Sequence, residues 1–212
     1  MITVKTFTFN SFQVNTYLLY DETGEALIID PACESSTELE QLYTFISENN
    51  LKPVAITNTH GHIDHIVGVN DVKNTYNIPF KLHTDDNPLL ENALYSAQIF
   101  GFNLETVPII DEPLDSNSEI KFGNSTLKMF HVPGHAPGSI CFYSEDDKFV
   151  IVGDVLFSGS IGRTDLPGGD YDLLISGIRE KLFTLPGDTA VYSGHGPSTS
   201  IQQEHDTNPF LK

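Results

Sequence analysis

The chain has 212 residues, of which 39% are hydrophobic and 10% aromatic, and its formal net charge is −18. This composition allows a full hydrophobic core, and because neither an internal repeat nor a low-complexity linker is visible we expect a single domain over residues 1–212. The negative charge, with only 11 Lys and Arg residues scattered along the chain, argues against a nucleic-acid partner or an acidic membrane surface.

The amino-terminal stretch MITVKTFTFN lacks a charged region followed by a long apolar run. No segment approaches the roughly 18 apolar residues of a membrane span, so we expect a cytoplasmic protein with no membrane partner. The two cysteines, Cys33 and Cys141, lie far apart in the sequence. They are interpreted as buried thiols rather than as a disulfide framework or a thiolate zinc site.

The first thirty residues have the composition of strands. Residues 2–9, 15–21 and 25–32 are rich in β-branched and aromatic side chains, and DETG at residues 21–24 has the character of a turn. We therefore predict antiparallel pairing in this part of the chain.

A helix and a buried strand are predicted next. Ser35 and Glu38 have the spacing of a capping box, and apolar residues recur at helical period through residues 39–46 before two asparagines end the pattern. The apolar run at residues 54–57 predicts a short buried strand. This strand leads directly into His60.

The second half repeats the order of a short strand followed by a polar loop. Strands are predicted at residues 125–132, 148–154 and 189–196, and a helix capped by Asp170 is predicted at residues 171–183. Each strand is followed by, or ends at, a possible ligand, in order His135, Asp154 and His195. Side chains on loops at strand ends are where catalytic groups are usually held.

The stretch THGHIDH at residues 59–65 holds three of the eight histidines of the chain. In an extended segment residues i and i+2 project to the same side, so His60 and His62 can converge on one point. Asp64 and His65 are adjacent, and neighbours in a regular helix do not face each other. The chain therefore turns here, and the two pairs of side chains favour two cations.

The candidate ligands comprise five imidazoles and two carboxylates, without a thiolate. They are His60, His62, Asp64, His65, His135, Asp154 and His195. This donor set suits zinc, iron or manganese better than calcium or magnesium, which prefer oxygen ligands. The remaining three histidines, His83, His131 and His205, are interpreted as structural or surface residues.

THGHIDH resembles the HxHxDH signature of the metallo-β-lactamase superfamily, and His135, Asp154 and His195 follow in the expected order and spacing. FQVNTYLLYD and ALIIDP also resemble the opening strands of that family, so the resemblance covers nearly the whole chain. It implies an α/β (α+β) fold of the four-layer αββα type. Two mixed sheets would lie face to face with helices outside and the metal site at one edge.

Within the superfamily the chain resembles glyoxalase II, the hydroxyacylglutathione hydrolase group, and particularly its short bacterial relatives. PGHAPGSICFY, GDVLFSGSIGRTDLPGGD and NPFL carry this resemblance. Ala32 stands where the family often has Gly, and Ala136 where it often has Thr. The helical C-terminal domain that helps full-size enzymes grip glutathione is expected to be missing.

The resemblance implies how the ligands are shared. His60, His62 and His135 would bind one metal, Asp64, His65 and His195 the second, and Asp154 would bridge both. We expect two divalent ions, zinc being favoured and iron or manganese the alternatives. Two cations about 3.5–4 Å apart can share one water as a hydroxide nucleophile. This predicts hydrolysis of a small-molecule thioester such as S-lactoylglutathione, with Asp64 and Asp154 as the catalytic carboxylates.

Two further residues are candidates for substrate binding. Arg163, on a glycine-rich loop after Asp154, would reach a substrate carboxylate or amide, and the alternative is a structural pair with Asp165 or a neighbouring acid. Tyr171 would line the same pocket, and the alternative is an aromatic residue of the core at the start of a helix.

Other functions stay open at this point. A persulfide dioxygenase with one iron shares the fold, and so does a β-lactamase or lactonase. A metal-binding module without activity is disfavoured because all seven ligands are intact, and a nuclease is disfavoured by the charge of −18. The acyl group, the thiol carrier and the oligomeric state are not determined by the sequence.

Overall fold

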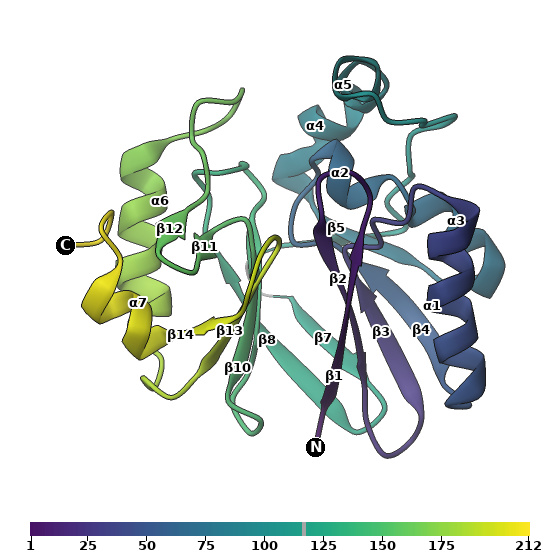
Figure 1. Ribbon diagram of the computed structural model, residues 1–212, viewed down its shortest axis with the longest axis horizontal. Coiled ribbons are helices and arrows are strands. Elements are labelled where there is room, and N and C mark those ends of the chain that lie inside the picture. The colour runs from purple at the N-terminus through teal and green to yellow at the C-terminus, as the bar shows by residue number, and fades with distance from the viewer. Residues whose placement is uncertain (116–117) are drawn as a thin grey trace.

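Two six-stranded sheets lie face to face, with helices on both outer sides, which is the predicted four-layer αββα arrangement (Figure 1). The computed structural model describes residues 1–115 and 118–212. The first sheet contains β1 Thr3–Phe9, β2 Val14–Tyr20, β3 Glu25–Ile29, β4 Lys52–Thr57, β5 Phe80–His83 and β6 Glu112–Leu114. The second contains β7 Glu119–Phe122, β8 Ser125–His131, β9 Ile140–Ser144, β10 Phe149–Gly153, β13 Ala190–Ser193 and β14 Thr199–Ser200. A small ribbon pairs β11 Leu156–Phe157 with β12 Ser160–Ile161.

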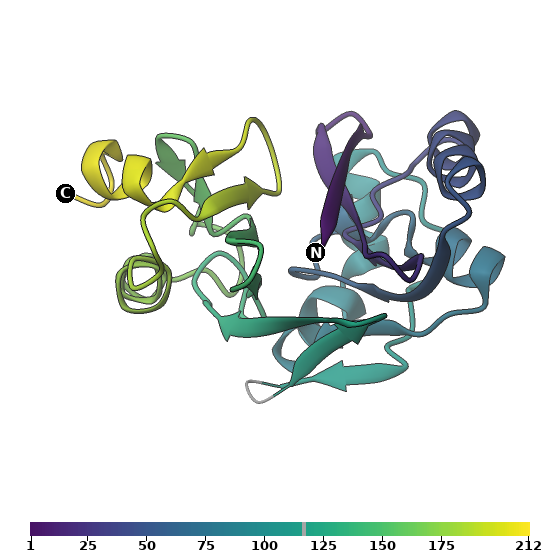
Figure 2. The ribbon, with the colours of Figure 1, turned by 90° about the horizontal axis from the view of Figure 1, so that it is seen from below.

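The helices divide between the two sheets along the chain. With the first sheet are α1 Ser36–Glu48, α2 Ile63–Ile66, α3 Val69–Tyr76, η1 Thr84–Asp86, α4 Asn87–Glu91 and α5 Ala93–Phe100. With the second sheet are α6 Tyr171–Gly177, η2 Ile178–Leu182 and α7 Ile201–Thr207. Figure 2 shows the two halves from below, with α1 and α3 on one outer side and α6 and α7 on the other. None of the helices in the described parts of the chain is long and apolar enough to cross a membrane.

Both sheets are mixed. The first has the order β1-β2-β3-β4-β5-β6, with antiparallel pairing from β1 to β3, as predicted, and parallel pairing from β3 to β6. The second has the order β14-β13-β10-β9-β8-β7, and only β10 and β13 pair in parallel. The carboxyl ends of parallel neighbours point to one edge, which is where binding sites form in such sheets.

The central strands are buried on both faces, which explains their continuous apolar runs. In β2, Leu18 packs with Leu42 and Ile46 of α1 in a core between the first sheet and its helices. Its neighbours Tyr17 and Leu19 belong to a second core, which lies between the two sheets and includes residues of β8, β9 and β10. A third core joins the second sheet to α6, η2 and α7. Three apolar layers therefore hold the four structural layers together.

The predicted helix after residue 35 is confirmed together with its capping box. The Ser35 hydroxyl accepts from the Glu38 backbone N–H at 3.3 Å, and the Glu38 carboxylate accepts from the Ser35 backbone N–H at 2.9 Å. Glu38 also accepts from the backbone N–H of Asn10 at 2.6 Å. The cap of α1 therefore also fixes the turn between β1 and β2.

Three predicted boundaries are corrected by the structure. The strand predicted to reach residue 32 ends at Ile29, because Asp30 has a φ of 51° and turns the chain out of the sheet. The strand predicted to reach residue 196 ends at Ser193, and the chain leaves it through Gly194 and a left-handed Gly196. The helix predicted at residues 171–183 changes at Ile178 into a π-helix, in which the Phe183 N–H bonds to the Ile178 carbonyl at 2.9 Å.

The two sheets are joined at the end opposite the ligand loops by Asp21. Its buried carboxylate accepts hydrogen bonds from the backbone N–H of Thr23 at 3.0 Å, the backbone N–H of Asn124 at 2.7 Å and the Ser125 hydroxyl at 2.8 Å. Burial alone would raise the pKa of Asp21, but these hydrogen bonds outweigh it and lower that pKa to about 2. The turn after β2 is thereby held against the turn between β7 and β8.

We expect Asp21→Ala to lower the free energy of unfolding by about 2 kcal/mol, because it removes a charged acceptor that receives several partly buried hydrogen bonds from two turns. The folded pKa of Asp21 is depressed, so its stabilisation is complete above the unfolded pKa of about 4 and is lost as pH falls towards about 2. Urea unfolding of wild type and variant between these pH values measures the difference, with the exposed Asp146→Ala as control. A difference that does not shrink at low pH would contradict this role.

Candidate metal centre

All seven predicted ligands lie at one edge of the molecule, where strand ends of both sheets meet. His60 and His62 follow β4, Asp64 and His65 lie in α2, and His135 follows β8. Asp154 directly follows β10 and His195 follows β13. The predicted order of strand, loop and ligand is therefore present in both halves of the chain, and the two halves together build one site.

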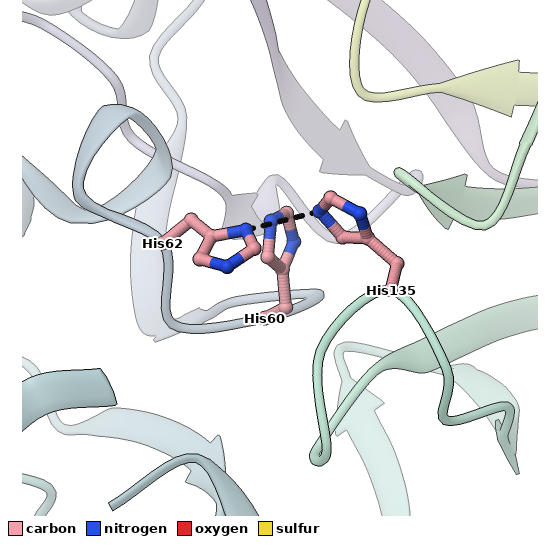
Figure 3. Close-up of side chains that lie close together, drawn as sticks. All are labelled: His60, His62 and His135. Carbon is pink, nitrogen blue, oxygen red and sulfur yellow. Dashed lines mark hydrogen bonds between the residues drawn. The ribbon is translucent and has the colours of Figure 1, made fainter. Parts of the chain in front are cut away.

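The first triad, defined as His60, His62 and His135, brings three imidazole nitrogens within 4.8 Å of one another. The Nδ1 atom of His62 lies 3.0 Å from the Nε2 atom of His135. Figure 3 shows the three rings converging, with His60 between the other two. Because His62 approaches through Nδ1 and His135 through Nε2, residues from two sheets can direct lone pairs at one point.

The second triad, defined as Asp64, His65 and His195, lies beside the first. The Oδ2 atom of Asp64 lies 3.4 Å from the Nε2 atom of His195 and 3.7 Å from the Nε2 atom of His65. The two rings are 5.3 Å apart between centroids. This triad offers two nitrogens and one oxygen, whereas the first offers three nitrogens.

Asp154 lies between the triads. Its Oδ2 atom is 3.5 Å from the Nε2 atom of His135 in the first triad and 3.4 Å from the Nε2 atom of His195 in the second. Its Oδ1 atom is 3.5 Å from the Nε2 atom of His65. One carboxylate therefore reaches ligands of both triads, which is the position expected of a bridging ligand.

The site fits divalent cations better than an internal hydrogen-bond network. Among the described residues, the buried Nε2 atom of His60 and the buried Oδ1 atom of Asp154 have no hydrogen-bond partner. Buried polar atoms without a partner are costly unless something else satisfies them. Imidazole nitrogens and carboxylate oxygens together are donors typical of zinc, iron and manganese. The cluster is therefore a binding site for divalent metal ions.

The pKa values of His60 and His62 are shifted in the opposite direction from those of His65 and His195. Burial lowers the pKa of His60 well below its usual value and that of His62 to about 4, and neighbouring imidazoles add to both effects. In the second triad burial alone would lower the pKa values of His65 and His195. The carboxylates of Asp64 and Asp154 outweigh burial, raising the pKa of His65 well above its usual value and that of His195 to about 9. His60 and His62 are thus held as neutral imidazoles, which is the form that binds a metal.

Hydrogen bonds to the far nitrogen fix the orientation of three ligand rings. His65 Nδ1 lies 3.0 Å from the Asp30 carboxylate, His135 Nδ1 lies 2.8 Å from the Arg163 carbonyl, and His195 Nδ1 lies 2.9 Å from the Phe12 carbonyl. An acceptor at Nδ1 holds the proton there and leaves Nε2 free to bind a metal.

Asp30 and Asn10 support the site without belonging to the ligand set, and the sequence-based search missed both. Asp30 also accepts from the Thr59 backbone N–H at 2.7 Å, and Asn10 donates through its side chain to the Asp64 carbonyl at 2.9 Å. Asp30 stands at the end of an apolar strand, the same signal that identified Asp154. No comparable signal marks Asn10, because its contact depends on the turn between β1 and β2.

A cavity of about 190 Å³ opens onto the ligands. Its apolar walls are Phe12, Ile63, Leu89, Phe100 and Leu166. Arg163 also lines it, and its guanidinium makes two hydrogen bonds of 2.7 Å to Asp165, the pairing that is the alternative to a substrate-binding role, which stays a prediction. Tyr171 lies half exposed at the start of α6 and is not among the residues lining this cavity. Its role in substrate binding stays a prediction.

The three histidines interpreted as structural or surface residues lie away from the seven ligands. His83 and His131 stack with ring centroids 4.2 Å apart, and Asp85 lies beside them. His131 Nε2 bonds to the Pro137 carbonyl at 2.7 Å and His83 Nδ1 accepts from the Asp85 N–H at 3.3 Å, whereas the buried Nε2 atom of His83 has no hydrogen-bond partner among the described residues. His205 is exposed beside Asp206.

The model of the metallo-beta-lactamase superfamily matches residues 10–195 of this chain. The chain is 40% identical to "Probable metallo-hydrolase YqgX" of Bacillus subtilis over 201 residues, which cover 94% of this chain and 92% of that protein. It is 38% identical to "Hydroxyacylglutathione hydrolase GloC" of Haemophilus influenzae over 203 residues, covering 95% and 94% of the two chains.

Solved structures agree with this assignment. The BLEG-1 B3 metallo-beta-lactamase superimposes with a TM-score of 0.91 at 41% identity, covering 99% of this chain and 100% of that one. The di-iron-bound form of TTHA1623 superimposes with a TM-score of 0.88 at 37% identity, covering 98% and 100%. The predicted fold and family resemblance are therefore confirmed.

The position of Asp154 predicts that its loss affects both metals. We expect Asp154→Asn to weaken binding at both subsites by at least about 10–100-fold, the loss typical even of a partner outside the ligand set, because Asp154 is placed as a ligand of both. His195→Ala should affect mainly one subsite. Metal content after dialysis against a limiting chelator compares the two, with the exposed His205→Ala as control. Equal metal retention by Asp154→Asn and His195→Ala would contradict a bridging role.

Proposed function

The chain belongs to the metallo-beta-lactamase superfamily and is a metal-dependent hydrolase, and from this premise we propose that it is a glyoxalase II-type thioesterase. The main observation in favour of hydrolysis at a two-metal site is that a single carboxylate, Asp154, lies between two complete donor triads. The similarity to hydroxyacylglutathione hydrolase over nearly the full length of both chains supports the thioester class.

We favour zinc in both subsites, with iron or manganese as alternatives. Nitrogen-rich donor sets bind all three metals, and a similar structure is described as di-iron-bound. Two bound divalent cations supply an activated water and a polarised substrate carbonyl. Hydrogen bonds within the protein hold the nitrogen and oxygen donors of the two triads in fixed positions.

Asp64 and Asp154 are the proposed catalytic carboxylates. Both have pKa values below their usual range. Burial alone would raise these values, but the neighbouring imidazoles of His65 and His195 outweigh it. As ionised acceptors next to the cavity, they can hold the proton of an attacking water and orient that water towards a carbonyl carbon. The departing thiolate is a good leaving group, so the reaction does not depend on a protein acid to protonate it.

The rest of the cavity contacts the non-reacting parts of the substrate. Phe12 and Phe100 form an edge-to-face pair with centroids 6.0 Å apart and present apolar surface beside the ligands. Arg163 is a permanent cation that lines the cavity, and its pair with Asp165 is exposed to solvent, where ion pairs contribute little to stability. A substrate carboxylate can therefore replace Asp165 at small cost.

A β-lactamase or lactonase is the second candidate, favoured by the 41% identity to a structure named as a B3 metallo-beta-lactamase. The persulfide dioxygenase is the third, and it requires iron and oxygen chemistry. The substrate screen below distinguishes all three functions.

For the zinc-loaded enzyme we expect hydrolysis of S-lactoylglutathione and of the same acyl group on a small uncharged thiol, with kcat/KM values within about tenfold of each other, since the cavity walls are mostly apolar. A β-lactam and a lactone with the zinc-loaded enzyme, and a persulfide with the iron-loaded enzyme in the presence of oxygen, should react more slowly by at least about two orders of magnitude. Removal of metal by a chelator should abolish thioester hydrolysis and re-addition should restore it. Faster hydrolysis of the β-lactam or lactone would replace the thioesterase proposal.

Arg163 and Asp165 allow a paired test of substrate charge. Arg163→Ala should lower kcat/KM for S-lactoylglutathione about three- to tenfold, with little effect on the uncharged thioester. Asp165→Asn, which frees the guanidinium, should lower KM for the acidic substrate. Parallel changes for both substrates in either variant would show that Arg163 has only a structural role.

A further inference from the structure

Asp86 is a fully buried carboxylate at the metal edge that does not belong to the seven ligands. It ends η1, directly after β5, and its side chain accepts two hydrogen bonds from backbone donors. The Gly61 N–H donates to Oδ2 at 2.8 Å, and the Gly138 N–H donates to Oδ1 at 2.6 Å. Each oxygen therefore holds a different loop.

These two loops carry the whole first triad. Gly61 stands between His60 and His62, and Gly138 lies three residues after His135. The first loop follows a strand of one sheet and the second connects two strands of the other sheet. A single carboxylate thus sets the distance between the two loops that direct His60, His62 and His135 at one point.

The packing around Asp86 is close enough to define this distance. A Cβ atom at Gly138 would lie 2.7 Å from Cγ of Asp86, and a Cβ atom at Gly61 would lie 3.3 Å from its Cβ. Only a glycine backbone lets the carboxylate approach Gly138 this closely. Asp86 is also the N-cap residue of α4, but its side chain makes no capping hydrogen bond to that helix. Among the described residues, the polar contacts of the carboxylate are therefore with the ligand loops.

The second triad is held by other groups. Asp30 bonds to His65, the Phe12 carbonyl bonds to His195, and the Asn10 side chain bonds to the backbone of Asp64. Asp86 makes no hydrogen bond to α2 or to His195 among the described residues, and its two backbone donors are Gly61 and Gly138. The two triads share Asp154, and Asp30 contacts both His65 and Thr59 beside His60, whereas the two hydrogen bonds of Asp86 go to the loops of the first triad.

We propose that Asp86 is a positioning residue that sets the metal affinity of the first triad independently of the second. The inference rests on the proposed two-metal site and not on the identity of the substrate. An orienting contact outside the ligand set typically changes metal affinity by about 10–100-fold. Loss of the Asp86 contact should therefore convert a two-metal protein into one that holds a single ion in the second triad at moderate metal concentration.

Asp86→Asn is the sharpest variant, because it keeps the size of the side chain but places an NH₂ group against one of the two backbone N–H donors. Asp85→Asn makes the same chemical change one residue earlier, at an exposed side chain that faces the His83 and His131 pair. Zn²⁺ titration by calorimetry gives the number and affinity of sites in both variants. The Co²⁺-substituted proteins add an absorption spectrum, which distinguishes a three-nitrogen site from a site with two nitrogens and one oxygen.

We expect Asp86→Asn to lose affinity at one subsite by about 10–100-fold and to keep the spectrum of the second subsite, whereas Asp85→Asn should bind as wild type does. Gly138→Ala, which pushes against Asp86 from the other loop, should reproduce the effect of Asp86→Asn. Circular dichroism of the metal-free proteins reports folding. A selective role would be overturned if Asp86→Asn left both metal affinities unchanged or weakened both subsites equally. It would also be overturned if Asp86→Asn and Gly138→Ala were both unfolded without metal. These readouts do not use substrate, so failure of the thioesterase proposal would leave this test unaffected.

Discussion

The buried contact between Asp30 and the loop after β4 is the interaction on which the metal centre depends. The Asp30 carboxylate accepts from the backbone N–H and the hydroxyl of Thr59 and from His65. One residue therefore fixes the start of the ligand loop, beside His60, and also the ring of His65. The left-handed backbone of Asp30, with a φ of 51°, brings this carboxylate out of the sheet and under the loop. Without that turn, the ligands of the first sheet would have no common support.

The second sheet must then be held against this loop. The apolar layer between the sheets, with Leu19 and Ile29 on one side and Phe142 and Ile151 on the other, brings the sheets together without setting the position of any ligand. Directional contacts at the edge do that, and they include the Ile140 N–H to the Thr59 carbonyl at 2.8 Å and the two hydrogen bonds of Asp86. A non-directional core and a few buried polar contacts thus have separate roles in building the site.

The features that the sequence predicted are local ones. Apolar strands that end at His60, His135, Asp154 and His195 predict the ligands, and the capping-box spacing of Ser35 and Glu38 predicts α1. The contact of Phe12 with His195 was not predictable in this way, because it joins residues 183 positions apart. The sequence also leaves open whether Arg163 pairs with Asp165 or faces a substrate, and the pair with Asp165 is visible only in the structure. The predicted strand end at residue 32 is wrong because Asp30 adopts a positive φ, and a residue pattern carries little information on that conformation.

The account rests on two metal ions bound side by side, and a crystal structure of the zinc-loaded protein with data collected across the zinc absorption edge tests this most directly. We expect two anomalous peaks per chain, one bonded to His60, His62 and His135 and the other to Asp64, His65 and His195, with Asp154 bonded to both. A single peak, or a second peak outside these ligands at saturating zinc, would contradict the binuclear site and the hydrolytic chemistry derived from it.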